Sequence, residues 1–211
     1  MQVITVVDID SGNLLSIKRS IENFGAKVKF TKNYKDFLKA DKIILPGVGA
    51  FGKAIKKLED IGFRDLVHEP KFKNIPTLGI CLGMQLLFEK SFEFGSHKGL
   101  GLIEGDIKLL PEFNKKHFKI PSIGWQQLII KENKNDPFNI LKNLTEIDKF
   151  YFVHSFCAYP NNTSDISANY YFDKNLIPAV TTKKNIIGFQ FHPEKSGKSG
   201  LNLINNFLNI W

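Results

Sequence analysis

A cysteine with a glycine two residues away on each side is the feature of this sequence most able to carry out covalent chemistry. Cys81 lies within Gly79-Ile80-Cys81-Leu82-Gly83, after a short apolar run and before a helical pattern. This spacing is typical of a nucleophile elbow, a sharp strand-to-helix turn whose small neighbours leave the nucleophile exposed. A thiol at a helix start is also favoured as the thiolate. An ordinary core cysteine followed by a helix would give the same pattern, so both interpretations stay open.

A thiolate that attacks a substrate needs a proton carrier, and His192 is the best placed of the five histidines. It ends the apolar run at residues 186–191, and Glu194 follows two residues later, after Pro193. Proline restricts the turn, so the carboxylate can reach back to the imidazole, hold its tautomer and stabilise the imidazolium. The alternative is a structural histidine at a strand end, whose ring nitrogens only make hydrogen bonds within the fold. Considering His192 together with Cys81 makes this alternative less favoured.

A glycine-rich loop, Pro46-Gly47-Val48-Gly49, follows another apolar run. Glycine permits unusual backbone angles, so the loop can present N–H groups from Val48 and Gly49 that, with the N–H of Leu82, form an oxyanion hole. A tight turn without function, or a phosphate cradle, would look similar.

The elements that must position these residues alternate between strand and helix in the first half of the chain. We expect strands at residues 3–7, 28–30, 42–45 and 77–80, and helices at residues 14–24, 36–39, 53–61 and 82–90. This alternation predicts an α/β fold, an open and mostly parallel sheet with helices on both faces, as in flavodoxin-like folds. Ligand sites of such sheets lie at the carboxyl ends of the strands.

The second half is predicted to add a smaller antiparallel β portion and a last helix. Short strands are expected at residues 107–109, 124–130, 150–154, 167–172, 179–182 and 186–191. The helix is expected at residues 199–208, and its apolar face should be buried through Leu201, Ile204, Leu208 and Trp211. The polar stretches 112–119 and 131–136 are expected to be exposed loops of the antiparallel sheet. We expect one domain over residues 1–211.

Composition excludes several classes of function. The chain has 211 residues, is 43% hydrophobic and has no apolar stretch close to the roughly 20 residues that span a bilayer. Its 29 basic and 21 acidic side chains give a net charge of +8, but the lysines are scattered in pairs, so we expect no nucleic-acid partner. Two cysteines are too few for a disulfide framework and fit a reducing, cytoplasmic compartment.

Together these features resemble the class I, or triad, glutamine amidotransferases over nearly the whole chain. The segments that carry the resemblance are residues 8–14, 45–52, 79–87, 99–103, 152–155 and 188–196. The loop Pro46-Gly47-Val48-Gly49 stands where anthranilate and GMP synthase glutaminases usually carry Gly-Gly-Pro. The chain therefore resembles most the glutaminase subunits of imidazole glycerol phosphate synthase.

The resemblance implies a role for each motif. Cys81 attacks the glutamine side-chain amide, His192 protonates the departing ammonia, and the same imidazole, oriented by Glu194, activates the water that releases glutamate. It also implies an oxyanion hole at Val48, Gly49 and Leu82, substrate contacts from Gln85, Glu93, His154, Ser155 and Phe156, and a partner interface at Asn13, Trp125, Tyr151 and Lys195. For some of these the ordinary alternatives are a solvated helix end at Glu93, a helix cap at Asn13, core aromatic residues and a surface lysine.

A partner follows from the same resemblance, because ammonia released into water is largely protonated and stops being a nucleophile. The expected partner is a HisF-like (β/α)₈-barrel synthase subunit, which uses the ammonia to make imidazole glycerol phosphate and AICAR in histidine biosynthesis. We expect no metal and no cofactor. Cys157 has no basic neighbour in sequence and is expected to be a buried free thiol.

Several departures from the family pattern lie near the expected interface: Ser122, Ile123 and Gln126, with Phe156 in place of a usual tyrosine. They motivate an alternative, a paralogue that supplies ammonia through a barrel-like partner to a sugar amidotransferase of surface-glycan synthesis. A non-catalytic scaffold is disfavoured because the triad is intact. A cysteine variant of the α/β-hydrolases is disfavoured because the acidic residue Glu194 follows His192 instead of preceding it.

Overall fold

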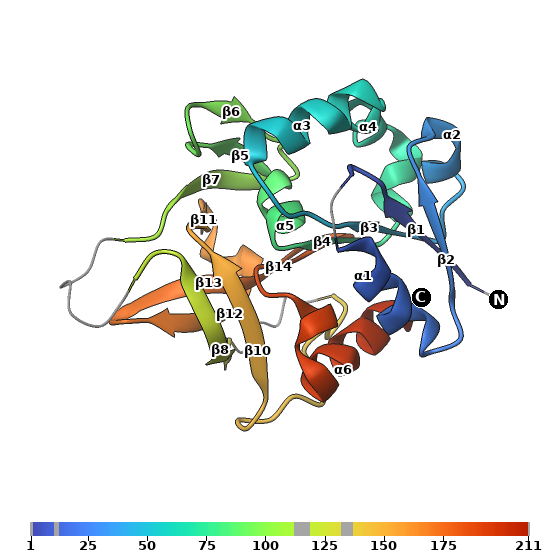
Figure 1. Cartoon of the computed structure of the whole chain (residues 1–211). Coiled ribbons are helices and arrows are strands. Elements are labelled where there is room, and N and C mark those ends of the chain that lie inside the picture. The colour runs from blue at the N-terminus through green and yellow to red at the C-terminus, as the bar shows by residue number, and fades with distance from the viewer. Residues whose placement is uncertain (1, 11–12, 112–118, 132–136, 211) are drawn as a thin grey trace.

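A mixed sheet of eight strands forms the centre of the chain (Figure 1). The computed structural model describes residues 2–10, 13–111, 119–131 and 137–210. The strand order is β2-β1-β3-β4-β14-β13-β12-β9, and the first five of these strands run parallel. The parallel strands are β1 (Val3–Val7), β2 (Lys27–Thr31), β3 (Lys42–Leu45), β4 (Thr77–Ile80) and β14 (Ile186–Phe189). The antiparallel strands are β13 (Asn175–Lys183), β12 (Ile166–Phe172) and β9 (Ile129–Ile130).

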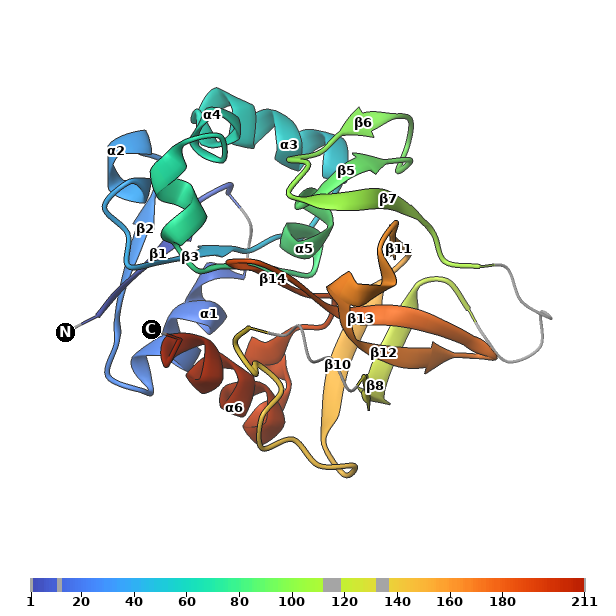
Figure 2. The ribbon, with the colours of Figure 1, turned by 180° about the vertical axis from the view of Figure 1, so that it is seen from behind.

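Helices cover both faces of the parallel part of this sheet (Figure 2). One face carries α1 (Leu14–Glu22) and α6 (Gly197–Leu208). The other carries α2 (Tyr34–Phe37), α3 (Phe51–Asp60), α4 (Phe63–Leu66), α5 (Leu82–Leu86) and the 3₁₀ helix η1 (Pro70–Asn74). Within the described ranges, no helix is both long and apolar enough to cross a bilayer.

Apolar side chains of the parallel strands alternate between two cores, one on each face of the sheet. On β3, Ile44 packs with α1 and α6, whereas Ile43 and Leu45 pack with α3 and α5. On β14, Phe189 faces the first core and Ile186 the second. Successive side chains of a strand point to opposite faces, so a strand covered on both sides must be apolar throughout. This is why these strands appear in the sequence as short continuous apolar runs.

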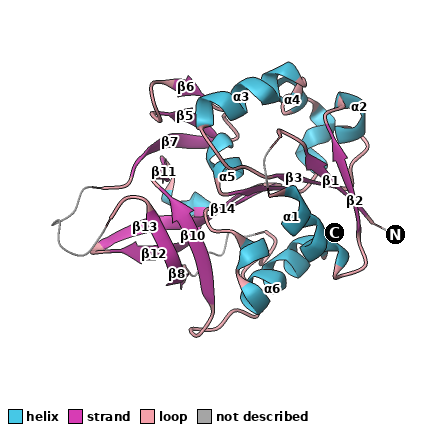
Figure 3. Ribbon diagram, viewed as in Figure 1, coloured by secondary structure: helices cyan, strands magenta, loops and turns pink. Residues whose placement is uncertain are grey.

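Two smaller sheets complete the fold (Figure 3). One has the order β11-β7-β5-β6, formed by β5 (Phe88–Ser91), β6 (His97–Lys98), β7 (Ile103–Leu109) and β11 (Phe156–Pro160). The other pairs β8 (Ser122–Gln127) with β10 (Lys149–His154). Short 3₁₀ turns, η2 (Thr163–Asp165) and η3 (Pro193–Lys195), precede β12 and α6.

The predicted fold class is confirmed, with three corrections to its elements. The helix expected over residues 82–90 ends at Leu86, because the backbone N–H groups of residues 100–103 donate to carbonyls of residues 86–88 and Phe88–Ser91 becomes β5. The strand expected at residues 186–191 was assigned to the antiparallel portion, but it forms β14, which lies parallel to β4 and antiparallel to β13. In α6, Ile204 and Leu208 are buried as predicted, but Leu201 is only partly buried. Leu203 and Phe207 are buried although they were not predicted to be. Trp211 and most of the two polar stretches lie outside the described residues.

Candidate active site

Three adjacent parallel strands bring the predicted catalytic segments to one edge of the central sheet. The strands β3, β4 and β14 are neighbours in that order. The loop 46–49 follows β3, Cys81 follows β4, and His192 comes three residues after the end of β14. Because Ile80 pairs with Phe189, the residues that follow these two strands emerge side by side. This is the carboxyl edge at which ligand sites of parallel sheets form.

The turn at Cys81 is a strained elbow that requires its two glycines. Cys81 has φ +53° and ψ −111°, a conformation that is costly for a residue with a side chain, and its N–H donates to Phe189 O at 2.7 Å. A Cβ at Gly79 would lie 2.7 Å from the backbone of Gly83. A Cβ at Gly83 would lie 1.8 Å from Leu45 O. The G-x-C-x-G spacing therefore reflects backbone-to-backbone packing of β3, β4 and α5.

The glycine-rich loop after β3 packs on the first turn of α5. A Cβ at Gly47 would lie 2.7 Å from the Gly83 nitrogen and 2.8 Å from Leu82 Cβ. Gly49 has φ +106°, a region that favours glycine. Val48, Gly49 and Leu82 line the same cavity as Cys81. The structure thus brings together the three residues predicted to form the oxyanion hole.

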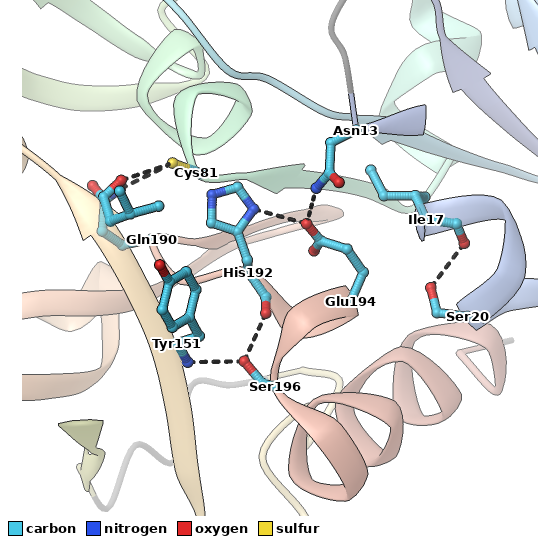
Figure 4. Close-up of polar contacts among 10 residues, drawn as sticks. Asn13, Ile17, Ser20, Cys81, Tyr151, Gln190, His192, Glu194 and Ser196 are labelled. Carbon is cyan, nitrogen blue, oxygen red and sulfur yellow. Dashed lines mark hydrogen bonds and ion pairs between the residues drawn. The ribbon is translucent and has the colours of Figure 1, made fainter. Parts of the chain in front are cut away.

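His192 and Glu194 form a buried pair next to the cysteine (Figure 4). His192 Nδ1 lies 2.8 Å from Glu194 Oε1, and the two side chains are 2% and 0% exposed. Asn13 Nδ2 donates a hydrogen bond to the same Oε1. Glu194 Oε2 is buried and has no hydrogen-bond partner among the described atoms. Asn13 precedes α1 but makes no capping bond there, so the helix-cap alternative is wrong and its amide instead holds the glutamate.

The surroundings of His192 favour its charged form. Burial alone lowers the pKa of the imidazole, but hydrogen bonds to Cys81 and Glu194 outweigh that effect and raise the pKa above the ordinary histidine value. An imidazolium therefore lies beside the sulfur at neutral pH. An adjacent positive charge stabilises a thiolate, the form that attacks an electrophilic carbon.

A cavity of about 310 Å³ opens at the sulfur. Its size is at the low end for small-molecule sites. All five predicted substrate residues line it: Gln85, Glu93, His154, Ser155 and Phe156. Pro121 and Val153 also line it, although nothing in the sequence pattern marks them.

Gln85 and Glu93 reach the cavity from different elements and are both held in place. Gln85, 5% exposed on α5, donates to Phe156 O at 2.8 Å. Glu93 lies between β5 and β6, where its Oε2 accepts from the N–H of Phe51 at 2.6 Å, at the start of α3. The alternative of a solvated helix end at Glu93 is wrong, because this carboxylate serves as the cap that α3 lacks from its own N-cap residue.

His154 is excluded from proton transfer by its environment. Burial lowers the pKa of this imidazole to about 4, and the charge of His192 adds to the effect, so His154 is neutral. Its Nδ1 lies 2.9 Å from Phe156 O, and a carbonyl oxygen only accepts, so Nδ1 carries the proton. Nε2 then accepts from the Tyr170 hydroxyl at 2.9 Å. The side chain of His154 therefore holds the 154–156 backbone against the core.

The residues predicted to meet a partner lie close to the triad. Trp125 on β8 is 53% exposed and packs edge-on against Tyr151 of β10, with ring centroids 5.9 Å apart. The backbone O of Tyr151 accepts from His192 N at 2.9 Å. Lys195 is exposed in η3. Partner contact by these residues and by Asn13 remains a prediction.

Besides Pro121 and Val153, two residues that contact the triad were missed by the sequence analysis, Ser196 and Gln190. Ser196 Oγ donates to His192 O at 2.6 Å and accepts from Tyr151 N at 2.9 Å, which ties β10 to the turn that carries the histidine. Gln190 is fully buried and contacts both Gln85 and Cys81. A polar residue in the apolar run Phe189-Gln190-Phe191 was the available signal, since buried polar side chains usually have a specific partner. In the part of the chain that the structure describes, no three or more His, Cys, Asp or Glu side chains are arranged to hold a metal ion.

Comparison with protein families gives a match over almost the whole chain. Residues 5–211 match the model of the family described as glutamine amidotransferase class-I. A protein of Legionella pneumophila (strain Lens) named imidazole glycerol phosphate synthase subunit HisH 1 is 41% identical over 213 residues, covering 100% of both chains. The HisH subunit of Aquifex aeolicus is 42% identical and covers 96% of this chain and 94% of its own. The HisH subunit of Wolinella succinogenes is 42% identical and covers 99% of this chain and 100% of its own.

Solved structures share the fold at much lower sequence identity. PurLQS from Thermotoga maritima superposes with a TM-score of 0.69 at 20% identity, covering 99% of this chain and 98% of that one. A structure described as a glutamine amidotransferase gives a TM-score of 0.68 at 16% identity, over 97% and 96% of the two chains. At these identities the likeness is evidence of the fold alone.

Proposed function

The chain belongs to the class I glutamine amidotransferases and, within them, to the imidazole glycerol phosphate synthase HisH subunits, and we propose that Cys81, His192 and Glu194 are its catalytic triad. It is a glutamine amidotransferase with glutaminase activity. The observation that carries the proposal is the geometry at the carboxyl edge of the sheet: a strained cysteine at a small cavity that His192 also lines, with the His192 imidazole held 2.8 Å from a buried carboxylate.

In the first half-reaction, the Cys81 thiolate attacks the side-chain carbonyl carbon of L-glutamine. The carbonyl oxygen becomes an oxyanion, which we assign to the backbone N–H of Leu82 and the loop at Val48 and Gly49. The His192 imidazolium gives its proton to the amide nitrogen, the carbon–nitrogen bond breaks, and ammonia leaves. A γ-glutamyl thioester and a neutral imidazole remain.

In the second half-reaction, the neutral His192 takes a proton from water, and the resulting hydroxide attacks the thioester carbon. Collapse of this intermediate expels the thiolate and frees glutamate, which restores the thiolate–imidazolium pair. Glu194 stabilises the imidazolium in both halves through the 2.8 Å bond to Nδ1. Asn13 acts through Glu194, because its amide donates to the same carboxylate oxygen.

The lining of the cavity supports glutamine as the substrate. Gln85 and Glu93 offer polar and acidic groups suited to the amino-acid end of the substrate, and Glu93 supplies the negative charge that an ammonium group requires. The 154–156 backbone, held by His154, covers the cavity from the β10–β11 side. Its size suits a small polar metabolite.

The ammonia is proposed to pass to a (β/α)₈-barrel synthase subunit in the cytoplasm, with which the chain forms a heterodimer that makes imidazole glycerol phosphate and AICAR. Support comes from the relatives named above, which carry the name of this synthase. Ile123 and Trp125 on β8 are 60% and 53% exposed, an apolar surface beside the triad that is suited to a partner.

The test measures glutamate release from glutamine by the purified chain, alone and with the barrel subunit of the same organism plus its phosphoribosyl-formimino ligand. A Cys81→Ala variant is the control for contaminating activity. We expect the barrel and its ligand together to stimulate a release that depends on Cys81. Absence of any Cys81-dependent release would refute the proposed triad.

The same assay separates the two ammonia acceptors considered above. If the chain hydrolyses glutamine in a Cys81-dependent way but this barrel and ligand never stimulate it, the ammonia goes to another acceptor, and the surface-glycan alternative becomes the first one to test. Histidine auxotrophy after deletion of the gene would independently support the histidine pathway.

A further inference from the structure

We infer that Gln190 is a positioning residue that holds the Cys81 sulfur through its side-chain amide. The inference rests on the proposed role of Cys81 and adds a residue outside the triad. Gln190 directly follows β14, where it lies beside the residue that follows β4, which is Cys81. Its Nε2 lies 3.9 Å from Cys81 Sγ (Figure 4).

Burial makes the partners of this side chain important. Gln190 is 0% exposed. A primary amide is costly to bury unless its oxygen and nitrogen both find partners. Here the oxygen accepts from Gln85 Nε2 at 3.1 Å, and the nitrogen faces the sulfur.

The orientation of the amide follows from a chain of hydrogen bonds that begins at a backbone carbonyl. Phe156 O can only accept, so the group of Gln85 that faces it at 2.8 Å must be the NH₂. That NH₂ uses its other hydrogen toward Gln190, so the oxygen of Gln190 must face Gln85. The NH₂ of Gln190 is left pointing at Cys81. The relay from Phe156 therefore fixes a donor, not an acceptor, at the sulfur.

A donor at this place favours the thiolate, because a hydrogen bond to an ionised acceptor is about twice as strong as a neutral one. The sulfur also lies 3.9 Å from Val153 O, which can accept from a thiol but offers nothing to a thiolate. Gln190 and the His192 imidazolium are thus the groups on which the ionised sulfur relies.

The test is the pH dependence of alkylation of the full-length chain by iodoacetamide, which reports thiolate without needing glutamine turnover. Cys157 does not interfere, because it is fully buried and burial raises the pKa of its thiol to about 12. Cys81→Ala gives the background. Gln190→Met removes the donor while keeping a similar volume. The exposed Gln127 of β8, changed to Met, is the matched control, since it lies outside the cavity lining.

We expect Gln190→Met to move the alkylation midpoint up by about one pH unit, which is an approximately tenfold loss of rate below the midpoint. Gln127→Met should leave it in place. If Gln190→Met fails to fold, Gln85→Met serves instead, because it frees the Gln190 amide to rotate and should shift the midpoint in the same direction. Where both fold, the double variant should shift no further than Gln190→Met alone.

A folded Gln190→Met chain whose midpoint moves by less than about half a unit would overturn the inference and leave Gln190 a purely structural residue. Failure of the proposed function looks different. In that case, wild-type Cys81 would still alkylate with the Gln190-dependent profile, but no glutamine would be hydrolysed with the partner present.

Discussion

Replacing Gly83 by alanine should destabilise the chain by an amount that the backbone geometry sets. A Cβ on this residue would lie 1.8 Å from Leu45 O, and it would meet the carbon of the same carbonyl at 2.8 Å. Both atoms belong to the backbone of β3, which pairs with β1 and β4 and cannot move without breaking those ladders. Overpacking a rigid site costs up to about 3 kcal/mol, and we expect Gly83→Ala to lie at or above that value.

Gly25→Ala is the matched control. Gly25 has φ +76°, but a Cβ there meets nothing within 4 Å, so the substitution measures backbone strain without a clash. We expect a cost of about 1 kcal/mol for the control. For a chain of this size, 1 kcal/mol corresponds to about 2–4 °C in Tm. The expected loss in Tm is therefore at least about 6–12 °C for Gly83→Ala and about 2–4 °C for Gly25→Ala.

The assay is thermal unfolding followed by circular dichroism, with urea unfolding as a second measure of free energy. Glutaminase activity distinguishes damage to the turn at Cys81 from a general loss of stability. Gly47, at the start of the glycine-rich loop, packs on the Gly83 nitrogen, so a shift at residue 83 displaces the loop that carries Val48 and Gly49. Glutaminase kcat should fall at least about tenfold in Gly83→Ala at a temperature where the variant is folded. A Gly83→Ala chain as stable as Gly25→Ala would refute this account of the motif.

Three further substitutions test other contacts of the site. Glu194→Gln keeps an oxygen toward His192 but removes the charge that raises the pKa of that imidazole, so it should cost about 1–2 kcal/mol of unfolding free energy. A raised histidine pKa stabilises the fold fully below the ordinary histidine pKa of about 6.5, and this stabilisation is lost as pH rises through the pKa of the folded state. The difference in unfolding free energy between wild type and Glu194→Gln, measured by urea titration, should therefore be largest near pH 6 and should shrink at alkaline pH. A difference that stays constant with pH would contradict this. Asn13→Ala should lower kcat by about tenfold with little change in KM, since it acts through Glu194, and a change confined to KM would count against it. Glu93→Ala removes the cap on Phe51 N and should lower Tm by about 2–4 °C while raising KM for glutamine, whereas an unchanged Tm would show that the cap adds nothing.

Local pattern predicted most of the elements near the site, and it failed where a long-range contact overrode the local signal. The strands Val3–Val7, Lys42–Leu45 and Thr77–Ile80 were predicted at their observed bounds. The helix after Cys81 was predicted four residues too long, since the run around Leu87 and Phe88 suits a helix as well as a strand. Pairing of β5 with β7 decided between them, and a periodicity within one segment cannot report that pairing.

The order of residues along the chain was enough to predict the fold class and to single out the candidate catalytic residues: a cysteine between two glycines, a histidine with a glutamate two residues later, and the alternation that builds a parallel sheet. These signals are local, because the strain of a turn and the reach of a side chain depend on a few adjacent residues. The tertiary structure alone decided which distant groups complete the site. It placed β14 beside β4, over 100 residues away in sequence, and so set Gln190 against Cys81, and it brought Asn13 to Glu194. Contacts of this kind depend on how the elements pack, which no pattern within a single segment of the chain encodes.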